Sequence, residues 1–177
     1  VPEATVFAFT GKVSHEDCVR EVSRQMGRLR PAPAPSYRLV DSGVAQNALA
    51  LKSKEIEQTH MALGFRIFGR HDKRRYALKA LNVILGENMS SRLFQTIREK
   101  HGLAYSVHSS VELFDETVVL GIQAGLDRNR IAKALELIVH ELARLKEKPV
   151  GAQELRRAKD YTIGQIRIGL ESTINQM

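Results

Sequence analysis

Alternation between apolar residues and polar or small ones predicts four strands after residue 46. A strand with one buried face places every second side chain on that face, so its apolar residues recur with a period of two. The predicted strands are Asn47 to Ser53, Gln58 to Phe68, Leu103 to Val111 and Val118 to Ala124. A short turn around Asp115 and Glu116 separates the last two. We therefore expect these two strands to pair as an antiparallel hairpin.

Apolar residues at helical spacing predict helices between and after these strands. Residues three or four apart share one face of a helix, and that face packs on the core. The predicted helices run from Asp72 to Gly86, from Ser90 or Ser91 to near Gly102, from Ile131 to Pro149, and from Gln153 to the last residue, Met177. A helix still running at Met177 suggests truncation there. The order β, β, α, α, β, β, α, α predicts an α+β fold, with a mostly antiparallel sheet covered by helices on one face.

The first 29 residues carry one predicted strand, Ala4 to Thr10, and one predicted helix. The helix begins after Ser14, which has Asp17 at capping-box spacing, and extends to Met26. A lone strand and helix bury too little surface to fold alone. We interpret residues 1–29 as the end of an upstream domain whose neighbours are removed or supplied in trans. Exposed strand edges also predict self-association, with a homodimer as one form.

Three prolines that alternate with alanine, Pro31, Pro33 and Pro35, follow this segment. Proline cannot continue a helix or the interior of a sheet, so the stretch is expected to be extended and stiff. The sequence thus predicts a linker over residues 30–45 and a second domain over residues 46–177 that is truncated at its C-terminus. The start, Val1-Pro2-Glu3, has neither an initiator methionine nor a signal-peptide pattern, and we interpret it as a cut.

Composition limits the class of protein and the compartment that we expect for the chain. Of its 177 residues, 43% are hydrophobic and 27% are charged. Charged residues interrupt every apolar stretch before it reaches the roughly 20 residues that cross a bilayer. We therefore expect a soluble protein with no membrane partner. The single cysteine, Cys18, excludes an intrachain disulfide and favours a reducing compartment, so we expect a cytoplasmic location.

A net charge of +7 suits an acidic partner such as nucleic acid. The basic residues, however, form short groups beside acidic neighbours on predicted helices, as in Lys73-Arg74-Arg75. They form no basic stripe interleaved with aromatic residues, which single-strand binders use. We therefore expect no nucleic-acid partner.

Several classes of catalytic site lack their residues. No two of the six histidines are three or four residues apart, so the helical pair of a zinc motif is missing and no metal is expected in this chain. The six are His15, His60, His71, His101, His108 and His140. Serine and cysteine catalysis have no support, because the chain has no Gly-x-Ser-x-Gly elbow and no cysteine with a matching histidine. Cys18 lies in an amphipathic helical stretch, which favours an inert structural thiol.

One segment stands apart, Leu85 to Val107, which reads Leu-Gly-Glu-Asn-Met-Ser-Ser-Arg-Leu-Phe-Gln-Thr-Ile-Arg-Glu-Lys-His-Gly-Leu-Ala-Tyr-Ser-Val. It closely resembles the signature in the second homologous domain of pitrilysin-type (insulinase-like) zinc metallopeptidases. That family includes bacterial processing-type proteases, insulin-degrading enzymes and mitochondrial processing peptidase. Two further segments are similar to the family, Phe9 to Glu16 to the end of its first domain and Gln58 to His60 to the opening of its second.

The resemblance implies a clamshell of two similar α+β halves. In the family, the first half supplies a His-x-x-Glu-His helix and a distal Glu, which hold and use zinc, and none of that motif is present here. The resemblance thus implies that zinc is bound by the missing half, in cis or in trans, and that this chain alone is inactive. It also implies that the complete metalloendopeptidase cleaves a peptide or unfolded polypeptide substrate.

In the family, the second half contributes an Arg and a Tyr that reach the substrate near the metal. These map onto Arg98 and Tyr105, as residues for substrate binding and transition-state support; no catalytic residue is expected in the chain itself. Spacing alone favours other roles. Tyr105 lies at the same strand parity as Leu103 and Val107, which is typical of a core tyrosine. Arg98 lies where its guanidinium can donate hydrogen bonds to the carbonyl groups at the end of its helix. Only the resemblance reverses this preference.

A non-catalytic role is the alternative. The same architecture occurs in regulatory subunits of two-chain peptidases and in core subunits of respiratory complexes, which are recognition or structural proteins. Retention of both Arg98 and Tyr105 favours the peptidase assembly. Ser90, Ser91 and Arg92 are interpreted as helix-start and packing residues rather than catalytic ones.

Overall fold

The computed structural model describes residues 2–36 and 59–176 of the chain. These residues divide into two compact units, 59–162 in one and 2–36 with 163–176 in the other. The predicted strand Asn47 to Ser53 and the second part of the predicted linker lie outside the described residues, and the predicted domain boundaries stay a prediction. Among the described helices, none combines the length and the apolar composition that a bilayer-crossing segment requires.

Helices and strands follow one another in the order expected of an α+β chain. The strands are β1 (Thr59–Arg66), β2 (Ala104–Leu113) and β3 (Val118–Leu126). The α-helices are α1 (His15–Met26), α2 (Arg75–Asn82), α3 (Ile131–Glu147), α4 (Ala152–Gly169) and α5 (Thr173–Gln176). Shorter helical segments are the 3-10 turns η1 (Pro2–Ala4) and η4 (Arg128–Arg130) and the π-helical η2 (Val83–Glu87) and η3 (Phe94–Lys100).

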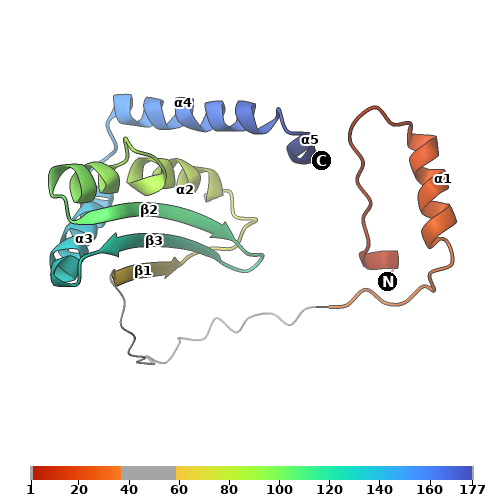
Figure 1. The fold of residues 1–177 in the computed structure, drawn as a ribbon, viewed down its shortest axis with the longest axis horizontal. Coiled ribbons are helices and arrows are strands. Elements are labelled where there is room, and N and C mark those ends of the chain that lie inside the picture. The colour runs from red at the N-terminus through yellow and green to blue at the C-terminus, as the bar shows by residue number, and fades with distance from the viewer. Residues whose placement is uncertain (1, 37–58, 177) are drawn as a thin grey trace. The chain divides into compact units, whose positions relative to one another are not determined.

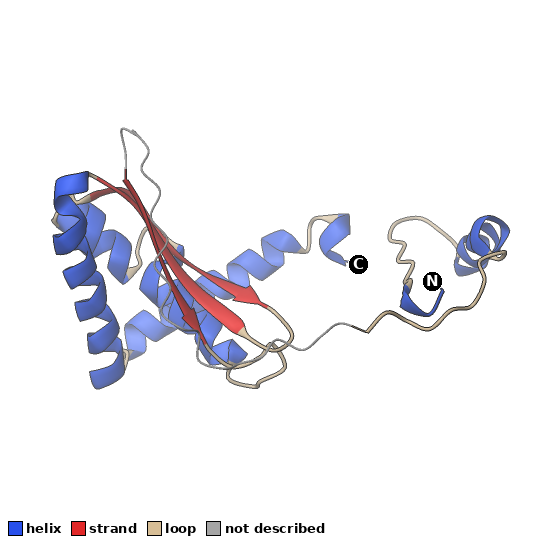
Figure 2. Ribbon diagram, turned by 90° about the horizontal axis from the view of Figure 1, so that it is seen from below, coloured by secondary structure: helices blue, strands red, loops and turns tan. Residues whose placement is uncertain are grey.

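The three strands form one twisted antiparallel sheet in the order β1-β3-β2 (Figure 1, Figure 2). In the middle of the sheet, Met61 and Val107 both lie opposite Ala124. The hairpin predicted from alternation is therefore confirmed as β2 and β3. Ile122 and Ala124 of β3 are buried under helices, whereas Gln123 between them is exposed. The predicted fold, an antiparallel sheet covered by helices on one face, is confirmed.

The core lies between the covered face of the sheet and the helices. Leu85, Leu93, Ile97 and Ile138 contribute fully buried side chains from the helical layer. Burial of such a side chain contributes about 1.5 to 3 kcal/mol relative to exposure, so these contacts hold the layer on the sheet. At Gly86 the helical layer lies very close to the sheet, since a Cβ atom there would lie 2.6 Å from the backbone nitrogen of Ser109 in β2. A side chain at this position would separate η2 from the strand.

Two of the predicted helices are wound partly as π-helix. The helix predicted from Asp72 to Gly86 begins as α2 at Arg75 and continues as η2 to Glu87, and the next helix is π-helical over most of its length as η3. A π-helical turn closes its hydrogen bonds over five residues and is rare outside functional or strained sites. Apolar spacing predicted both helices but does not distinguish this winding from an ordinary α-helix.

The N-terminal helix is confirmed, but the strand before it is not. α1 begins as predicted, because the Ser14 hydroxyl accepts a hydrogen bond from the Asp17 N–H at 3.1 Å. The predicted strand Ala4 to Thr10 is wrong, since η1 ends at Ala4 and residues 5–10 have no regular secondary structure. A strand needs a neighbour that pairs with its backbone, and the one sheet of the described residues consists of β1, β2 and β3.

The last predicted helix is shorter than expected. It begins as α4 at Ala152 and ends at Gly169, and α5 follows separately, so the prediction of one helix running to Met177 is wrong. Between the two helices, the Ser172 N–H donates to the Gly169 carbonyl oxygen at 3.2 Å in a turn. Glycine and serine both lower helix propensity, because glycine is conformationally free and serine competes for backbone hydrogen bonds.

Candidate functional site

Arg98 and Tyr105, the two residues predicted to support the substrate, lie side by side. Arg98 is in the last turn of η3, and Tyr105 is the second residue of β2. The guanidinium carbon of Arg98 lies 5.8 Å from the centre of the Tyr105 ring and 4.9 Å from the centre of the Phe94 ring. At these distances the cation is attracted to the faces of aromatic rings. The rings therefore orient a guanidinium that stays partly exposed, at 43% of its side chain.

The turn between these residues is set by Gly102, whose φ of 58° lies in the left-handed region. The Gly102 N–H donates to the Arg98 carbonyl at 3.0 Å, and the Leu103 N–H donates to the Ile97 carbonyl at 2.9 Å. Paired bonds around a left-handed residue end a helix and reverse the chain, and glycine adopts that conformation without steric cost. Arg130 supports the turn, because its Nη1 donates to the Gly102 carbonyl oxygen at 2.6 Å.

A β-bulge directs Tyr105 away from the core. The pairing of β2 with β3 shifts between Ala104 and Ser106, which leaves Tyr105 as the extra residue. Ala104 and Val107 are buried, whereas Tyr105 is 76% exposed and Ser106 is exposed as well. A bulge inserts one residue into a strand and re-aims its side chains, so parity with Val107 no longer places Tyr105 inside. The interpretation of Tyr105 as a core tyrosine is therefore wrong.

The sheet face opposite the core is polar and built of small residues. Its exposed side chains on neighbouring strands include Ser106, His108, Gln123, His60 and Ala62. Tyr105 and Ser106 leave β2 on the side away from the core, so the Arg98–Tyr105 pair adjoins this face. Because this face is polar, it does not form a large exposed apolar patch, which would need to be covered.

A half-buried ion pair joins the helical turn that leads into η3 to α4. Arg92 donates from Nε and Nη2 to the two carboxylate oxygens of Glu154 at 2.8 and 2.7 Å. The hydrogen bond from Arg92 is the main cause that holds the pKa of Glu154 below its ordinary value, and burial opposes it. The same bond raises the pKa of Arg92. Ser91 beside it is almost fully buried. These residues dock α4 on the helical layer.

A buried polar pair, Ser109 and Asn82, ties the end of α2 to β2, the strand that carries Tyr105. The Ser109 hydroxyl donates to Asn82 Oδ1 at 2.7 Å, and Asn82 Nδ2 donates to Glu87 Oε2 at 2.7 Å. This pair was not predicted from the sequence. A signal was present, because Ser109 occupies the buried parity between Val107 and Val111, where a polar side chain needs a partner.

Zinc does not fit the described residues of this chain. Within residues 2–36 and 59–176, no three His, Cys, Asp or Glu side chains are grouped so that they could hold a metal ion. The Arg98 guanidinium and the Tyr105 hydroxyl are hydrogen-bond donors. The site can therefore bind a carbonyl oxygen or a developing oxyanion, but its described residues provide no place for a metal.

Comparison with known proteins gives a consistent set of matches. Residues 1–161 match the family model described as the peptidase M16 inactive domain. The chain is 36% identical over 182 residues to an uncharacterized zinc protease of Mycobacterium leprae, covering 99% of this chain and 40% of that protein. It is 34% identical over 176 residues to the uncharacterized zinc protease YmxG of Bacillus subtilis, covering 99% of this chain and 42% of that protein. The chain thus spans well under half the length of these relatives.

Solved structures show the same fold. A protease from Helicobacter pylori is similar with a TM-score of 0.77 and 25% identity, covering 92% of this chain and 40% of that one. A peptidase M16 inactive domain from Pseudomonas fluorescens is similar with a TM-score of 0.57 and 29% identity, covering 61% of this chain and 26% of that one.

Proposed function

Because the chain belongs to the peptidase M16 inactive-domain family, we propose that it is the substrate-binding, non-zinc half of a zinc-dependent metalloendopeptidase. Its relatives named zinc proteases are more than twice as long as the part that it covers. In this proposal, zinc and the residues that hydrolyse the peptide bond lie outside the chain, on the same polypeptide or on a partner. The chain contributes the groups that hold a peptide or unfolded polypeptide in place.

The observation that carries the proposal is the contact between Arg98 and Tyr105 beside the open face of the sheet. The Tyr105 ring is exposed by the bulge, and the Arg98 guanidinium lies 5.8 Å from its centre. Both side chains keep N–H or O–H groups for a ligand. Donors placed in advance around a reacting carbonyl stabilise the charge that develops on its oxygen, which is a large part of catalysis of acyl transfer.

The test is cleavage of a quenched peptide library by the complete two-half protein. We expect Tyr105→Phe, which removes only the hydroxyl group, to lower kcat by about a hundredfold with little change in KM. Arg98→Lys keeps the charge but loses the planar fork, and Arg98→Ala removes both, so activity should fall in that order.

Arg75 and Tyr76 on α2 offer a matched control. They form a similar pair, with the Arg75 guanidinium carbon 4.8 Å from the Tyr76 ring centre, at a different place on the fold. Tyr76→Phe and Arg75→Lys should leave cleavage unchanged. If the Arg98→Ala and Tyr105→Phe proteins cleave as well as the unmodified protein, the assignment of these residues is overturned.

The same experiment addresses the non-catalytic alternative. Zinc content and cleavage are measured for this chain alone and for the chain combined with the rest of the protein. Activity and stoichiometric zinc only in the combined sample support the peptidase half. Their absence in every combination would instead assign a regulatory or structural role to the chain.

A further inference from the structure

A hollow adjoins Tyr105, and Arg98 is not part of its lining. It is open to solvent, with a volume of about 430 Å³. It forms where the turn before β2 meets the end of β3 and the start of η4. Its lining includes Gly102, Tyr105, Asp127 and Arg130. Tyr105 is thus shared between the proposed substrate site and this hollow, so a peptide held at Tyr105 can place a neighbouring group here.

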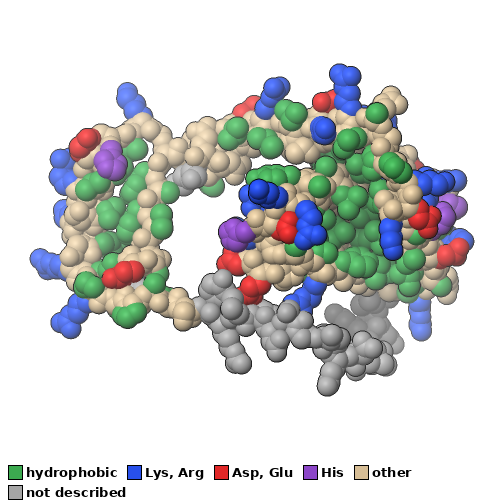
Figure 3. All heavy atoms as spheres, turned by 180° about the vertical axis from the view of Figure 1, so that it is seen from behind, with side chains coloured by type: hydrophobic (Ala, Val, Ile, Leu, Met, Phe, Trp, Pro, Cys, Tyr) green, Lys and Arg blue, Asp and Glu red, His purple; other side chains and the backbone are tan. Residues whose placement is uncertain are grey.

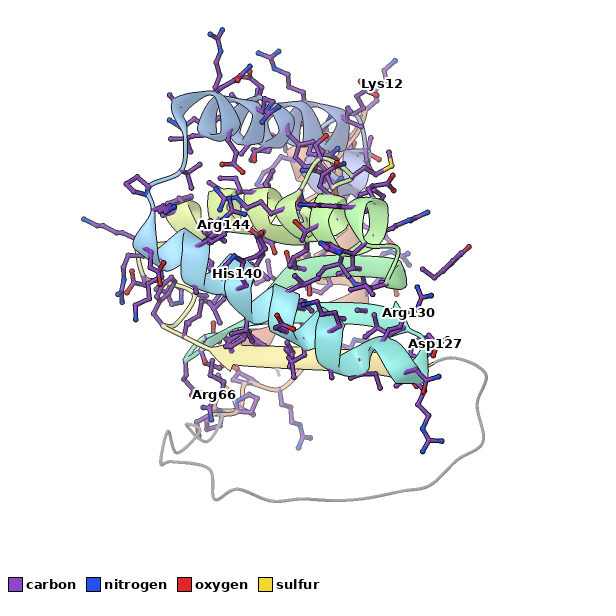
Figure 4. The ribbon with its side chains drawn as sticks, turned by 90° about the vertical axis from the view of Figure 1, so that its left-hand side faces the viewer. Lys12, Arg66, Asp127, Arg130, His140 and Arg144 are labelled. Carbon is purple, nitrogen blue, oxygen red and sulfur yellow. The ribbon has the colours of Figure 1, made fainter. Side chains whose placement is uncertain are left out.

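Arg130 gives the hollow a positive side. One of its N–H groups donates to the Gly102 carbonyl oxygen at 2.6 Å, and a guanidinium has five N–H donors, so others remain for a ligand. Neither Arg130 nor the nearby Arg128 makes an ion pair with a carboxylate within the described residues. Figure 4 shows Arg130 at the start of α3.

The acidic residue of the lining is already engaged. Asp127 is the N-cap of η4, and its carboxylate accepts a hydrogen bond from the Asn129 N–H at 2.8 Å. At this end of the sheet, the positive charges of Arg98, Arg128 and Arg130 outnumber this negative charge. Arg98 also has an acidic neighbour, since its Nε lies 3.8 Å from Glu99 Oε1. A cationic excess beside an open, polar hollow attracts an anionic group.

Building on the proposed function, we propose that this hollow is a subsite for a carboxylate of the peptide substrate, held by Arg130 next to Tyr105. A guanidinium fork matches the two oxygens of a carboxylate, and the charge-assisted bonds are stronger than neutral ones. The carboxylate belongs to an acidic side chain or to the peptide C-terminus. The complete protein therefore prefers substrates that carry a carboxylate at one position.

The test measures binding rather than cleavage, so it is independent of zinc. Fluorescein-labelled ten-residue peptides are titrated with the 177-residue chain, and affinity is read by fluorescence anisotropy. One series moves a single Glu through each position of an amidated neutral peptide, with Gln at the same position as reference. A second series compares the free C-terminal carboxylate with the amide. We expect one series to show about tenfold tighter binding for the carboxylate, which corresponds to about 1.4 kcal/mol.

Arg130→Gln should abolish this difference. Because this variant also loses the bond to the Gly102 carbonyl oxygen, each Glu peptide is compared with its own Gln reference in the same variant, so that a general change in affinity does not enter the result. Arg130→Lys keeps the positive charge but lacks the planar fork of the guanidinium, so it should retain part of the difference. Comparison of the Gln and Lys variants therefore separates the effect of the charge from the effect of the fork. Arg66→Gln is the matched control. It removes the same charge at the end of β1 that lies away from the hollow (Figure 4). By the rise per residue of a strand, Arg66 lies roughly 23 Å from Thr59, the residue of β1 that pairs beside the hollow. This variant should keep the full difference.

Equal weakening by Arg130→Gln and Arg66→Gln would overturn the subsite, because it would indicate only the overall positive charge. The absence of any carboxylate preference in either series would overturn it too. These failures are distinguishable from failure of the proposed function. A complete protein that cleaves peptides, depends on Arg98 and Tyr105, and has no acidic preference would retain the function and lose only the subsite.

Discussion

Gly102 connects the two side chains on which the proposed function depends. It ends η3 after Arg98 and begins the approach to Tyr105, with a φ of 58°. Apart from its chain neighbours, nothing lies within 4 Å of the position that its Cβ would take, so no other part of the fold excludes a side chain there. The backbone conformation alone requires glycine, because left-handed geometry brings a Cβ close to the following carbonyl oxygen.

Replacement of this glycine is therefore expected to act through backbone strain. Gly102→Ala should lower the free energy of unfolding by about 1 to 2 kcal/mol, measured by urea denaturation followed by circular dichroism. Gly64→Ala in β1 is the control. Gly64 has no positive φ, and its Cβ would lie 3.8 Å from Val119, so we expect no loss of stability. Equal losses for the two variants would contradict the strain argument.

Two features of the sequence made conflicting predictions for Tyr105. Its type and its distance from Arg98 along the chain pointed to a family role, whereas its parity with Val107 pointed to the core. The bulge decides between these, because it removes the alternation at that point of β2. A bulge depends on how two strands pair, which the sequence of one strand does not contain.

α4 docks on the helical turn that leads into η3 through the ion pair of Arg92 and Glu154. Their side chains are 17% and 27% exposed. Both residues lie on helices predicted from periodicity, but they are 62 positions apart, so the pairing became visible only in the folded chain. Removing one partner of a largely shielded ion pair costs more than removing one partner of an exposed pair, because the charge that remains is shielded from water and has lost its counter-ion.

The pKa of Glu154 makes the contribution of this pair dependent on pH. Hydrogen bonding by Arg92 lowers the folded-state pKa of Glu154 below its unfolded value of about 4.3. The stabilisation is thus complete above the unfolded pKa and is lost as pH falls through the folded pKa. Glu154→Gln should lower the free energy of unfolding by about 2 kcal/mol at pH 7, and the difference from the unmodified chain should shrink in acid. Urea denaturation between pH 7 and pH 3 measures both.

Glu136→Gln on α3 is the control for this experiment. Glu136 pairs with Lys133 at 2.9 Å, but both side chains are more than half exposed. Exposed pairs contribute little, so this substitution should leave stability nearly unchanged at every pH. A Glu154→Gln difference that stays constant from pH 7 to pH 3 would show that the carboxylate charge is not responsible.

The unit that contains the N-terminal segment has exposed apolar side chains (Figure 3). Phe7 and Phe9, at 44% and 52% exposed, line a hollow with Val19 and Val22 of α1. The strand expected there is not formed, so an unpaired strand edge no longer supports self-association. Exposed apolar side chains in one patch still do.

We therefore expect the 177-residue chain to self-associate with rising concentration in sedimentation velocity. The double change Phe7→Ser and Phe9→Ser should weaken association by about tenfold or more, since aromatic side chains dominate such contacts. Met89→Ser removes another exposed apolar side chain, 72% exposed, and should have little effect. A chain that sediments as a monomer at high concentration would contradict the prediction.

The fold class, the positions of most helices and strands, and the segment from Leu85 to Val107 that is typical of the family could all be predicted from the amino-acid sequence. These follow from local patterns: hydrophobic periodicity, the Ser14 cap and a contiguous motif. The tertiary structure decided the rest. Pairing of β2 with β3 created the bulge that exposes Tyr105, and only the folded chain brought Arg130 to Gly102 and Arg92 to Glu154. Such contacts join residues far apart in sequence, so no local pattern specifies them.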